Sequence, residues 1–208
     1  MGSVDRRTRE RETTRERIID TAREMFARDG YDAVTMRAIA QRIEYTPPAI
    51  YHHFRDKDDL IQEICRRDFG ALAGGFTRLA SVKDPVERLR RIGHTYVDFA
   101  LDHPNHYRVM FMTPLPKSAK VGIDHKNPDQ DAYAFLLKTV EEALRAGRFR
   151  PEHRDAALLA QLLWASVHGV ASLHIAKGQD DWIEWRNPRT SGNRMVEAMM
   201  HGVLRETA

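Results

Sequence analysis

The sequence predicts an all-α protein, with an N-terminal group of three helices and a larger helical part after it. Along the 208 residues, apolar side chains recur three and four positions apart in one segment after another, as on one face of a helix. No segment alternates apolar and polar residues as a half-buried strand does, and no internal repeat is visible. Capping and helix-breaking residues fall at the ends of the periodic segments and separate them into individual helices.

The first helix is predicted from Thr13 to Asp29. Thr13 followed by Glu16 is a capping-box pattern, and Gly30 is the residue type that ends a helix. Residues 1–12 before it are rich in arginine and acid and poor in apolar residues, which indicates a flexible arm.

Two short helices are predicted next, separated by a tight turn. Thr35 can cap the first and Thr46 the second, and Pro47 and Pro48 suit a first helical turn, whose N–H groups have no intrahelical acceptor. Helices this short cannot bury enough apolar surface alone, so we expect them to pack against the helix before them. The combination over residues 13–56 is typical of a helix-turn-helix DNA-binding domain, whose second helix enters the major groove.

Residues 57–208 are predicted to form a linking helix and a second helical domain. Asp56 can cap the linking helix, whose apolar stripe continues to Leu79. The segment 154–176 is apolar around much of its circumference, so we expect partners on two sides of it. The other predicted helices cover 85–102, 104–112, 129–146 and a last segment that follows a polar connector at 182–193.

Composition is typical of a soluble globular protein. No apolar run reaches the length of about eighteen residues that indicates a membrane span, and the start of the chain lacks the apolar core of a signal peptide. We therefore expect a cytoplasmic protein without a membrane partner. The single Cys65 excludes an internal disulfide. The net charge of +3 arises after residue 68, because acidic and basic residues balance before it, so bulk charge does not argue for nucleic-acid binding.

The histidines and aromatic residues of the second half leave an alternative open, a helical enzyme or small-molecule carrier with the N-terminal helices as scaffold. No His-Glu-x-x-His pair, cysteine pair, phosphate loop or nucleophile–base pattern is visible. We therefore predict no metal, no cofactor and no enzymatic activity.

An ordered pattern surrounds the turn and, together with the first helix before it, spans some fifty residues. It consists of Asp29-Gly30-Tyr31 at the end of the first helix, Thr-Met-Arg-Ala-Ile-Ala at 35–40, Tyr-His-His-Phe at 51–54, and Lys57. This pattern resembles the TetR family of bacterial transcriptional regulators. Segments 102–111 and 164–169 are similar to the TetR subgroup whose ligand domain is named for its Trp, His and Gly. The resemblance implies a homodimeric repressor with a C-terminal ligand-binding and dimerisation domain, released from a palindromic operator in double-stranded DNA by a small-molecule effector.

The resemblance also implies which residues contact DNA. Phosphate contacts fall on Thr35, Tyr51 and Lys57. Base readers fall on Arg37, Thr46, Pro47, Pro48, Ala49 and His52. The chemistry agrees, because hydroxyls and ammonium groups hold phosphates and arginine can bind guanine through two hydrogen bonds. Tyr51 could instead be a core residue, His52 could be solvated, and the arginines of the arm could reach a minor groove or play no part.

Seven side chains of the second half are candidates to line an effector pocket, with the alternative that they pack one helix onto the next. They are Tyr96, Phe99, Tyr107, Met110, Phe111, Trp164 and His168.

The turn departs from the pattern of the family. Members commonly have Gly-Val-Ser there, whereas this chain has Glu44-Tyr45-Thr46. Since the glycine position often needs a positive φ, Glu44 predicts either backbone strain or a reshaped turn.

Overall fold

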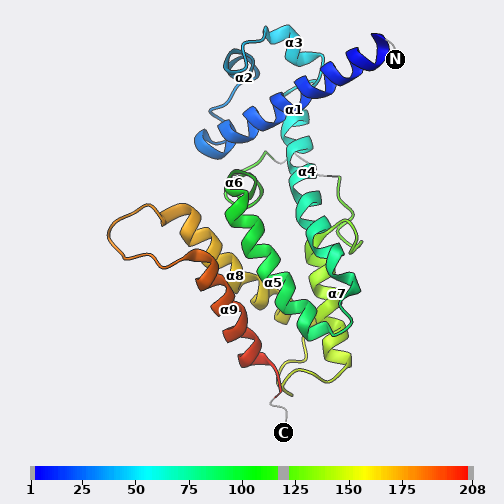
Figure 1. Ribbon diagram of the computed structural model, residues 1–208, viewed down its shortest axis with the longest axis vertical. Helices are drawn as coiled ribbons and strands as arrows, with labels where there is room; N and C mark the ends of the chain where they lie inside the picture. Colours follow the sequence, from blue (N-terminus) through cyan, green and yellow to red (C-terminus); the bar gives the residue numbers. More distant parts are fainter. Residues whose placement is uncertain (1–2, 117–121, 206–208) are drawn as a thin grey trace. The chain divides into compact units, whose positions relative to one another are not determined.

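The computed structural model describes residues 3–116 and 122–205, and these are helical apart from loops and one isolated bridge between Phe149 and Leu204 (Figure 1). The all-α prediction is confirmed. The chain divides into two compact units, one formed by Met1–Asp68 and Asn105–Gly122, the other by Phe69–Pro104 and Ile123–Ala208. The first unit therefore extends past residue 56, where the sequence predicts the end of the DNA-binding domain, and includes a segment from later in the chain.

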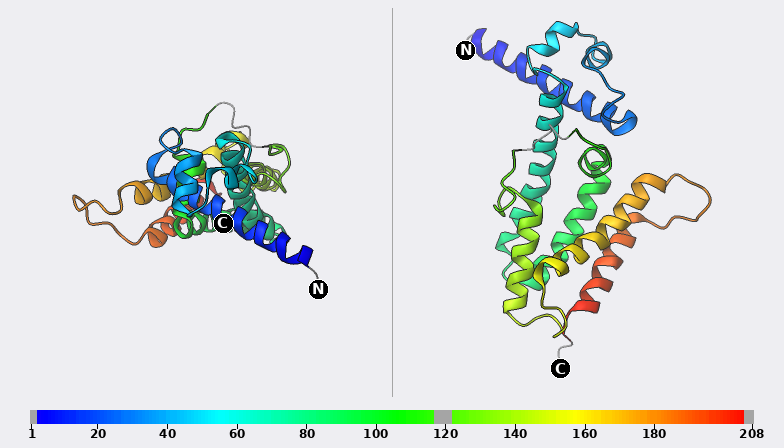
Figure 2. Two further views of the ribbon diagram at one scale, coloured as in Figure 1. Left: turned by 90° about the horizontal axis from the view of Figure 1, so that it is seen from above. Right: turned by 180° about the vertical axis from the view of Figure 1, so that it is seen from behind.

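The first unit is built on a long N-terminal helix. Helices α2 and α3 follow it and are joined by a short turn, and α2 packs against α1 (Figure 2). The helices that contribute to this unit are α1 (Ser3–Asp29), α2 (Met36–Arg42), α3 (Pro47–Tyr51), the first part of α4 (Lys57–Thr77) and α6 (Pro104–Phe111).

Helix α1 begins ten residues before the predicted start at Thr13. The hydroxyls of Thr13 and Thr14 donate to the carbonyl oxygens of Arg9 and Glu10 at 2.9 Å, as these residues do inside a helix rather than at a cap. Residues 3–12 therefore continue α1, and the predicted boundary between an arm and a helix is wrong. The predicted end is confirmed: Gly30 has a φ of 81° and its N–H donates to the Phe26 carbonyl at 3.0 Å.

Asp56 caps α4 as predicted, because its carboxylate accepts a hydrogen bond from the Asp59 N–H at 2.7 Å.

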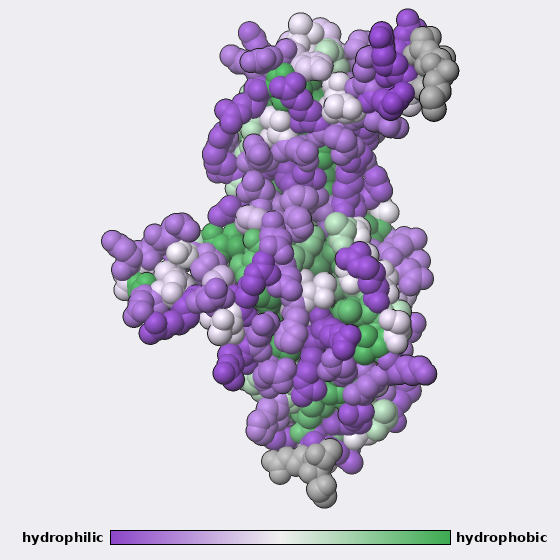
Figure 3. All heavy atoms as spheres, in the orientation of Figure 1, coloured by the Kyte–Doolittle hydropathy of each residue, from purple (hydrophilic) through white to green (hydrophobic). Residues whose placement is uncertain are grey.

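Apolar side chains from α1 to α4 form one core. Side chains no more than 2% exposed include Ile18, Ile19, Ala22, Phe26, Ile39, Ile43, Ile50, Phe54, Leu60, Ile61 and Ile64. Outside this core, the surface of the unit seen in Figure 3 is mostly hydrophilic.

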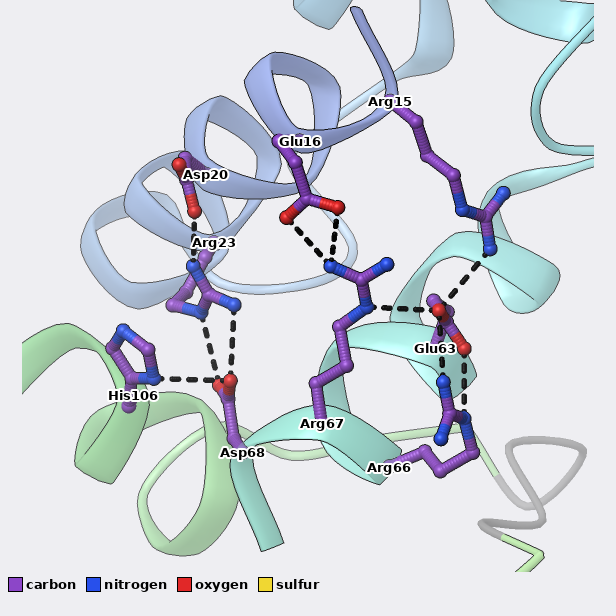
Figure 4. A network of polar contacts seen from close by, with 9 residues as sticks. All are labelled: Arg15, Glu16, Asp20, Arg23, Glu63, Arg66, Arg67, Asp68 and His106. Atoms are coloured by element: carbon purple, nitrogen blue, oxygen red, sulfur yellow. Dashed lines mark hydrogen bonds and ion pairs between the residues drawn. The ribbon is translucent and has the colours of Figure 1, made fainter. Parts of the chain in front are cut away.

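A surface network of ion pairs joins α1 to α4 around Glu63 (Figure 4). The Glu63 carboxylate accepts hydrogen bonds from Arg66 and Arg67 at 2.8 Å and pairs with Arg15 at 3.2 Å. Arg67 also reaches Glu16 of α1 at 2.6 Å. Burial alone would raise the pKa of Glu63, but the three arginines outweigh it and lower the pKa to about 2.

Replacing Glu63 by glutamine is expected to reduce stability in a pH-dependent way. Because the pKa of Glu63 lies below its value in the unfolded chain, its contribution is fully present above that value and is lost as the pH falls towards 2. We expect the Glu63→Gln variant to lose about 2 kcal/mol of unfolding free energy at pH 7, a figure already reduced for solvent screening, and about a quarter of that at pH 2.5. Urea unfolding of both proteins between pH 2.5 and 7 measures this; a constant difference would contradict it.

The second unit is a helical bundle around α5. Helix α5 (Pro85–Asp102) packs against α7 (Ala132–Arg145), α8 (Ala156–Lys177) and α9 (Pro188–Val203), and a 3₁₀ turn, η1 (Arg78–Ser81), precedes it. Glycines let α5 and α9 approach closely: a Cβ on Gly93 or on Gly192 would lie 2.6 Å from a valine methyl of the facing helix.

Helix α9 begins earlier than the sequence predicts. Asn187 caps it by accepting a hydrogen bond from the Thr190 N–H at 3.0 Å, and Pro188 occupies its first turn. The connector between α8 and α9 therefore ends at Asn187, and the prediction that it extends to Asn193 is wrong.

Helix α8 is apolar on all sides, and one side of it is exposed. It packs against α5, α7 and α9, with Leu159 and Val167 at most 5% exposed. On the opposite side Leu158, Leu162 and Leu173 are 54%, 45% and 57% exposed. By length and composition alone α8 could cross a membrane, but a helix of a bundle core passes the same test.

Candidate nucleic-acid interface

Helix α2 has one buried apolar face and one exposed polar face. The Thr35 hydroxyl accepts a hydrogen bond from the Ala38 N–H at 3.1 Å, which confirms the predicted cap. Met36 and Ile39 are buried, whereas Arg37 between them is exposed. The Arg37 guanidinium is therefore free of the core and presented on the surface.

The turn after α2 keeps the shape that a glycine normally allows. Glu44 has a φ of 61°, the one positive φ among the non-glycine residues that the structure describes. The Tyr45 N–H donates to the Ala40 carbonyl at 2.9 Å and the Glu44 N–H to the Gln41 carbonyl at 3.2 Å, the two bonds of a Schellman motif. Of the two predicted outcomes for Glu44, backbone strain is the one observed.

Replacing Glu44 by glycine is expected to stabilise the protein and strengthen its binding to DNA. Glycine adopts this left-handed conformation without the cost of about 1 kcal/mol that other residues pay, so the free energy of unfolding should rise by about that amount. It also removes a negative charge next to the third helix, so DNA affinity should rise several-fold. Urea unfolding and DNA titration measure the two effects.

Glu44→Gln is the matched control, because it removes the charge and keeps the strained backbone. It should reproduce the gain in affinity without the gain in stability. A Glu44→Gly variant no more stable than the glutamine variant would contradict the strain at this turn.

Helix α3 starts on its two prolines but without a side-chain cap. Thr46 occupies the N-cap position, yet its hydroxyl makes no cap hydrogen bond, so this part of the prediction is wrong. The reason is local: Pro47 and Pro48 have no N–H to offer, and the Ala49 N–H donates to the Thr46 carbonyl at 3.0 Å. Thr46 is exposed, and its hydroxyl is not used to cap the helix.

Most of the predicted DNA-contacting side chains lie on the surface. Tyr51 is 53% exposed, which excludes the alternative that it is a core residue. Tyr45, 37% exposed in the turn before α3, is a candidate that the sequence reasoning missed, although its place beside Glu44 could have indicated it. The exposed members of the predicted set are Thr35, Arg37, Thr46, Pro48, Tyr51 and His52, and the partly exposed ones are Pro47, Ala49 and Lys57.

Lys57 is tied to the loop between α1 and α2. Its ammonium donates to the carbonyl oxygens of Tyr31 and Val34, both at 2.9 Å, and lies 4.1 Å from the centre of the Tyr31 ring. Two of its three N–H donors are therefore used inside the protein. The Tyr31 hydroxyl donates to Asp58, and burial together with that carboxylate raises the pKa of Tyr31.

His53 is partly buried, and its backbone is bound to α1. Arg15 of α1 donates to the His53 carbonyl at 3.0 Å and covers the Phe54 ring at 4.3 Å. Burial, followed by the charges of Arg11 and Arg15, lowers the pKa of His53.

Three of the seven predicted pocket residues meet in the second unit. The Tyr96 hydroxyl lies 2.8 Å from Nδ1 of His168, and the Trp164 ring lies 5.8 Å from the His168 ring. Burial lowers the pKa of His168. Tyr133, which sequence reasoning missed, packs against Trp164 at 6.1 Å. These contacts form an aromatic cluster with one polar pair.

Phe99, Tyr107 and Phe111 make ring contacts, each within one unit. Phe99 packs against His103 at 5.4 Å. Tyr107 and Phe111 pack on each other at 5.1 Å and, with Met110, belong to the first unit. A surface pocket of about 260 Å³ in the second unit includes none of the seven; it lies between the end of α8 and the connector, beside Leu173 and Trp185.

Comparison with known proteins agrees with this architecture. Residues 18–64 match the family model described as bacterial regulatory proteins, tetR family, and residues 89–203 match the model described as tetracyclin repressor-like, C-terminal domain. The regulator UidR of Escherichia coli K12 is 26% identical over 80% of this chain and 84% of its own length. The transcriptional activator FasR of Mycolicibacterium smegmatis is 30% identical over 79% of this chain and 70% of its own length.

The fold also matches solved structures. That of PfmR, a TetR family transcriptional regulator from Thermus thermophilus, has a TM-score of 0.71 and 20% identity, and the match covers 90% of this chain and 99% of that one. Together the two family models cover the helix-turn-helix and most of the second unit. The chain belongs to the TetR family of transcriptional regulators.

Proposed function

We propose that the chain is a homodimeric repressor that binds a palindromic operator through α2 and α3 and is released from it by a small-molecule effector. One observation carries the proposal. The Schellman turn holds α2 and α3 on a shared core and leaves Arg37, Thr46, Tyr51 and His52 exposed around that turn. A regulator of this family works from the cytoplasm, where its DNA lies.

The exposed side chains divide by chemistry into two roles. The hydroxyls of Thr35 and Tyr51 and the third N–H of Lys57 are suited to phosphate oxygens. Arg37 and His52 can donate to base edges, and the first turn of α3, with Thr46, Pro47, Pro48 and Ala49, offers small surfaces to base edges and thymine methyls.

The exposed side of α8 supports a dimer. Leu158, Leu162, Ala165, Gly169 and Leu173 recur at helical spacing on this side, and a Cβ on Gly169 would meet no atom within 4 Å. Ala198 and Gly202 are exposed on the neighbouring α9. An apolar face with small residues suits close packing of two helices on their copies, which gives a four-helix interface with twofold symmetry.

The aromatic cluster supports the effector site. Tyr96, Trp164 and His168 offer flat apolar surfaces and one polar pair, which fits an apolar or aromatic effector with one polar group. The position of Trp164, His168 and Gly169 also supports the subgroup named for those residue types.

Selection of bound sequences from a random library of duplex DNA tests the proposal without a known operator. We expect an inverted repeat whose half-sites are separated by about one helical turn, or a multiple of it, as twofold symmetry requires. A reporter gene placed behind the selected sequence then distinguishes a repressor, which lowers expression, from an activator. Recovery of no sequence motif would refute DNA recognition.

A further inference from the structure

The chain passes between its two units three times, at Asp68–Phe69, at Pro104–Asn105 and at Gly122–Ile123, and the first two passages lie in helices. The first passage lies inside α4, and the second lies in the first turn of α6. Residues beside these two passages meet in one polar cluster with α1, formed by Arg23, Asp68 and His106 (Figure 4).

A single carboxylate holds this cluster together. Asp68 accepts two hydrogen bonds from Arg23, from Nε and from Nη2, each at 3.0 Å. Nδ1 of His106 lies 3.0 Å from the same carboxylate, within ion-pair distance when the imidazole is protonated. Arg23 is itself oriented by Asp20, which accepts from Nη1 at 2.7 Å. One carboxylate therefore joins α1 to α4 through two hydrogen bonds and lies beside His106 of α6.

The cluster lies in an apolar environment. The side chain of Asp68 is 1% exposed and that of Arg23 is 8% exposed. The neighbouring Cys65 is fully buried, and burial, followed by the charge of Asp68, raises the pKa of its thiol to about 12. A charge pair in such surroundings is costly to break, because each partner left alone would be a buried, uncompensated charge. Arg23 and Asp68 are therefore expected to keep one defined geometry.

The network around Glu63 differs in this respect. It also joins α1 to α4, but Arg67 and Glu16 are 30% and 53% exposed, and no residue of α6 takes part in the contacts shown. Water and salt screen it more strongly. It therefore offers an internal control, an ion pair between the same two helices that does not reach the second passage.

We propose that Arg23, Asp68 and His106 act as positioning residues for DNA binding, because they set the directions in which α4 and α6 leave the first unit. The inference rests on the proposed function and extends it to regulation. The chain passages are covalent routes from the second unit to the first, and Asp68 and His106, beside two of them, lie at one carboxylate with Arg23 of α1. Removing the His106 imidazole frees α6 from the carboxylate, while the bidentate Arg23–Asp68 pair still holds α1 to α4.

Distance measurement between the units tests this role. Cysteines introduced at Arg42 and Lys138, both exposed, are labelled with a fluorescent donor and acceptor, and the labelled protein is diluted into an excess of unlabelled protein. The native Cys65 is fully buried and should not react. The variants are His106→Leu, which removes the imidazole, His106→Gln, which keeps a nitrogen donor, and Glu16→Gln as the matched control. His106 is 30% exposed, so these changes should be tolerated.

We expect His106→Leu to broaden the distribution of distances and to weaken binding to the selected operator by about tenfold. His106→Gln should restore part of both properties, and Glu16→Gln should leave both as in the parent. A His106→Leu protein with the parent's distance distribution would overturn the inference, and so would an equal broadening in Glu16→Gln. The distances are measured within one chain without DNA, so failure of the proposed function, seen as no selected sequence, is a separate result.

Discussion

Replacing Leu162 by glutamate should convert the proposed dimer to monomers and weaken operator binding by about 100-fold or more. Leu162 is 45% exposed in the middle of the apolar side of α8. In a twofold interface the substitution places two unpaired carboxylates on a surface that would be dehydrated, which costs several kcal/mol. A monomer also loses the gain in affinity that comes from linking two reading helices, about 10²–10⁴-fold.

Light scattering and operator titration measure the two effects of Leu162→Glu. Ser81→Glu is the control, because it adds the same charge at an exposed position of η1. It should remain dimeric and bind like the parent. A Leu162→Glu protein that stays dimeric would show that another surface forms the dimer.

Replacing Arg37 by alanine should reduce discrimination between DNA sequences. A bidentate arginine–guanine contact contributes about 1–3 kcal/mol of discrimination, so the ratio of affinities for the selected and a scrambled duplex should fall by roughly 10- to 100-fold. Arg37 has an exposed side chain on the surface of α2, so stability should change little.

Tyr51→Phe is the matched comparison for Arg37→Ala. It removes one hydroxyl from a side chain that is 53% exposed and keeps the ring. If Tyr51 contacts a phosphate, affinity should fall by a similar factor for both duplexes and the ratio should stay unchanged. Arg37→Ala with an unchanged ratio would mean that Arg37 does not read bases. Lys57 is less suitable, since its substitution also removes two hydrogen bonds to the α1–α2 loop.

The helices could be predicted wherever an apolar stripe or a cap marked them. Thr35, Asp56 and Gly30 cap or end helices as expected. The predicted start of α1 fails because its first turns carry no apolar stripe; residues 6–12 are exposed and form pairs such as Arg6 with Glu10, one turn apart. The start of α9 fails for the same reason, although Asn187 before a proline was a usable signal.

The candidate site could be predicted as a set of residues but not as a set of contacts. The family pattern indicates Lys57 as a DNA contact, whereas its hydrogen bonds to residues 23 and 26 positions earlier depend on how α1 and α4 pack. Likewise Arg23 and Asp68 are 45 positions apart, so no local spacing indicates their pair. Long-range polar contacts of this kind follow from tertiary packing, which periodicity does not specify.

Titration of the selected operator duplex at rising salt tests the central claim, DNA recognition through α2 and α3, most directly. With Arg37 and Lys57 of both subunits near phosphates or bases, affinity should fall by about 10²-fold between 50 and 200 mM salt. The scrambled duplex should bind more weakly at every salt concentration and show a similar or smaller slope. Equal affinity for the two duplexes, or binding that salt does not weaken, would contradict the account.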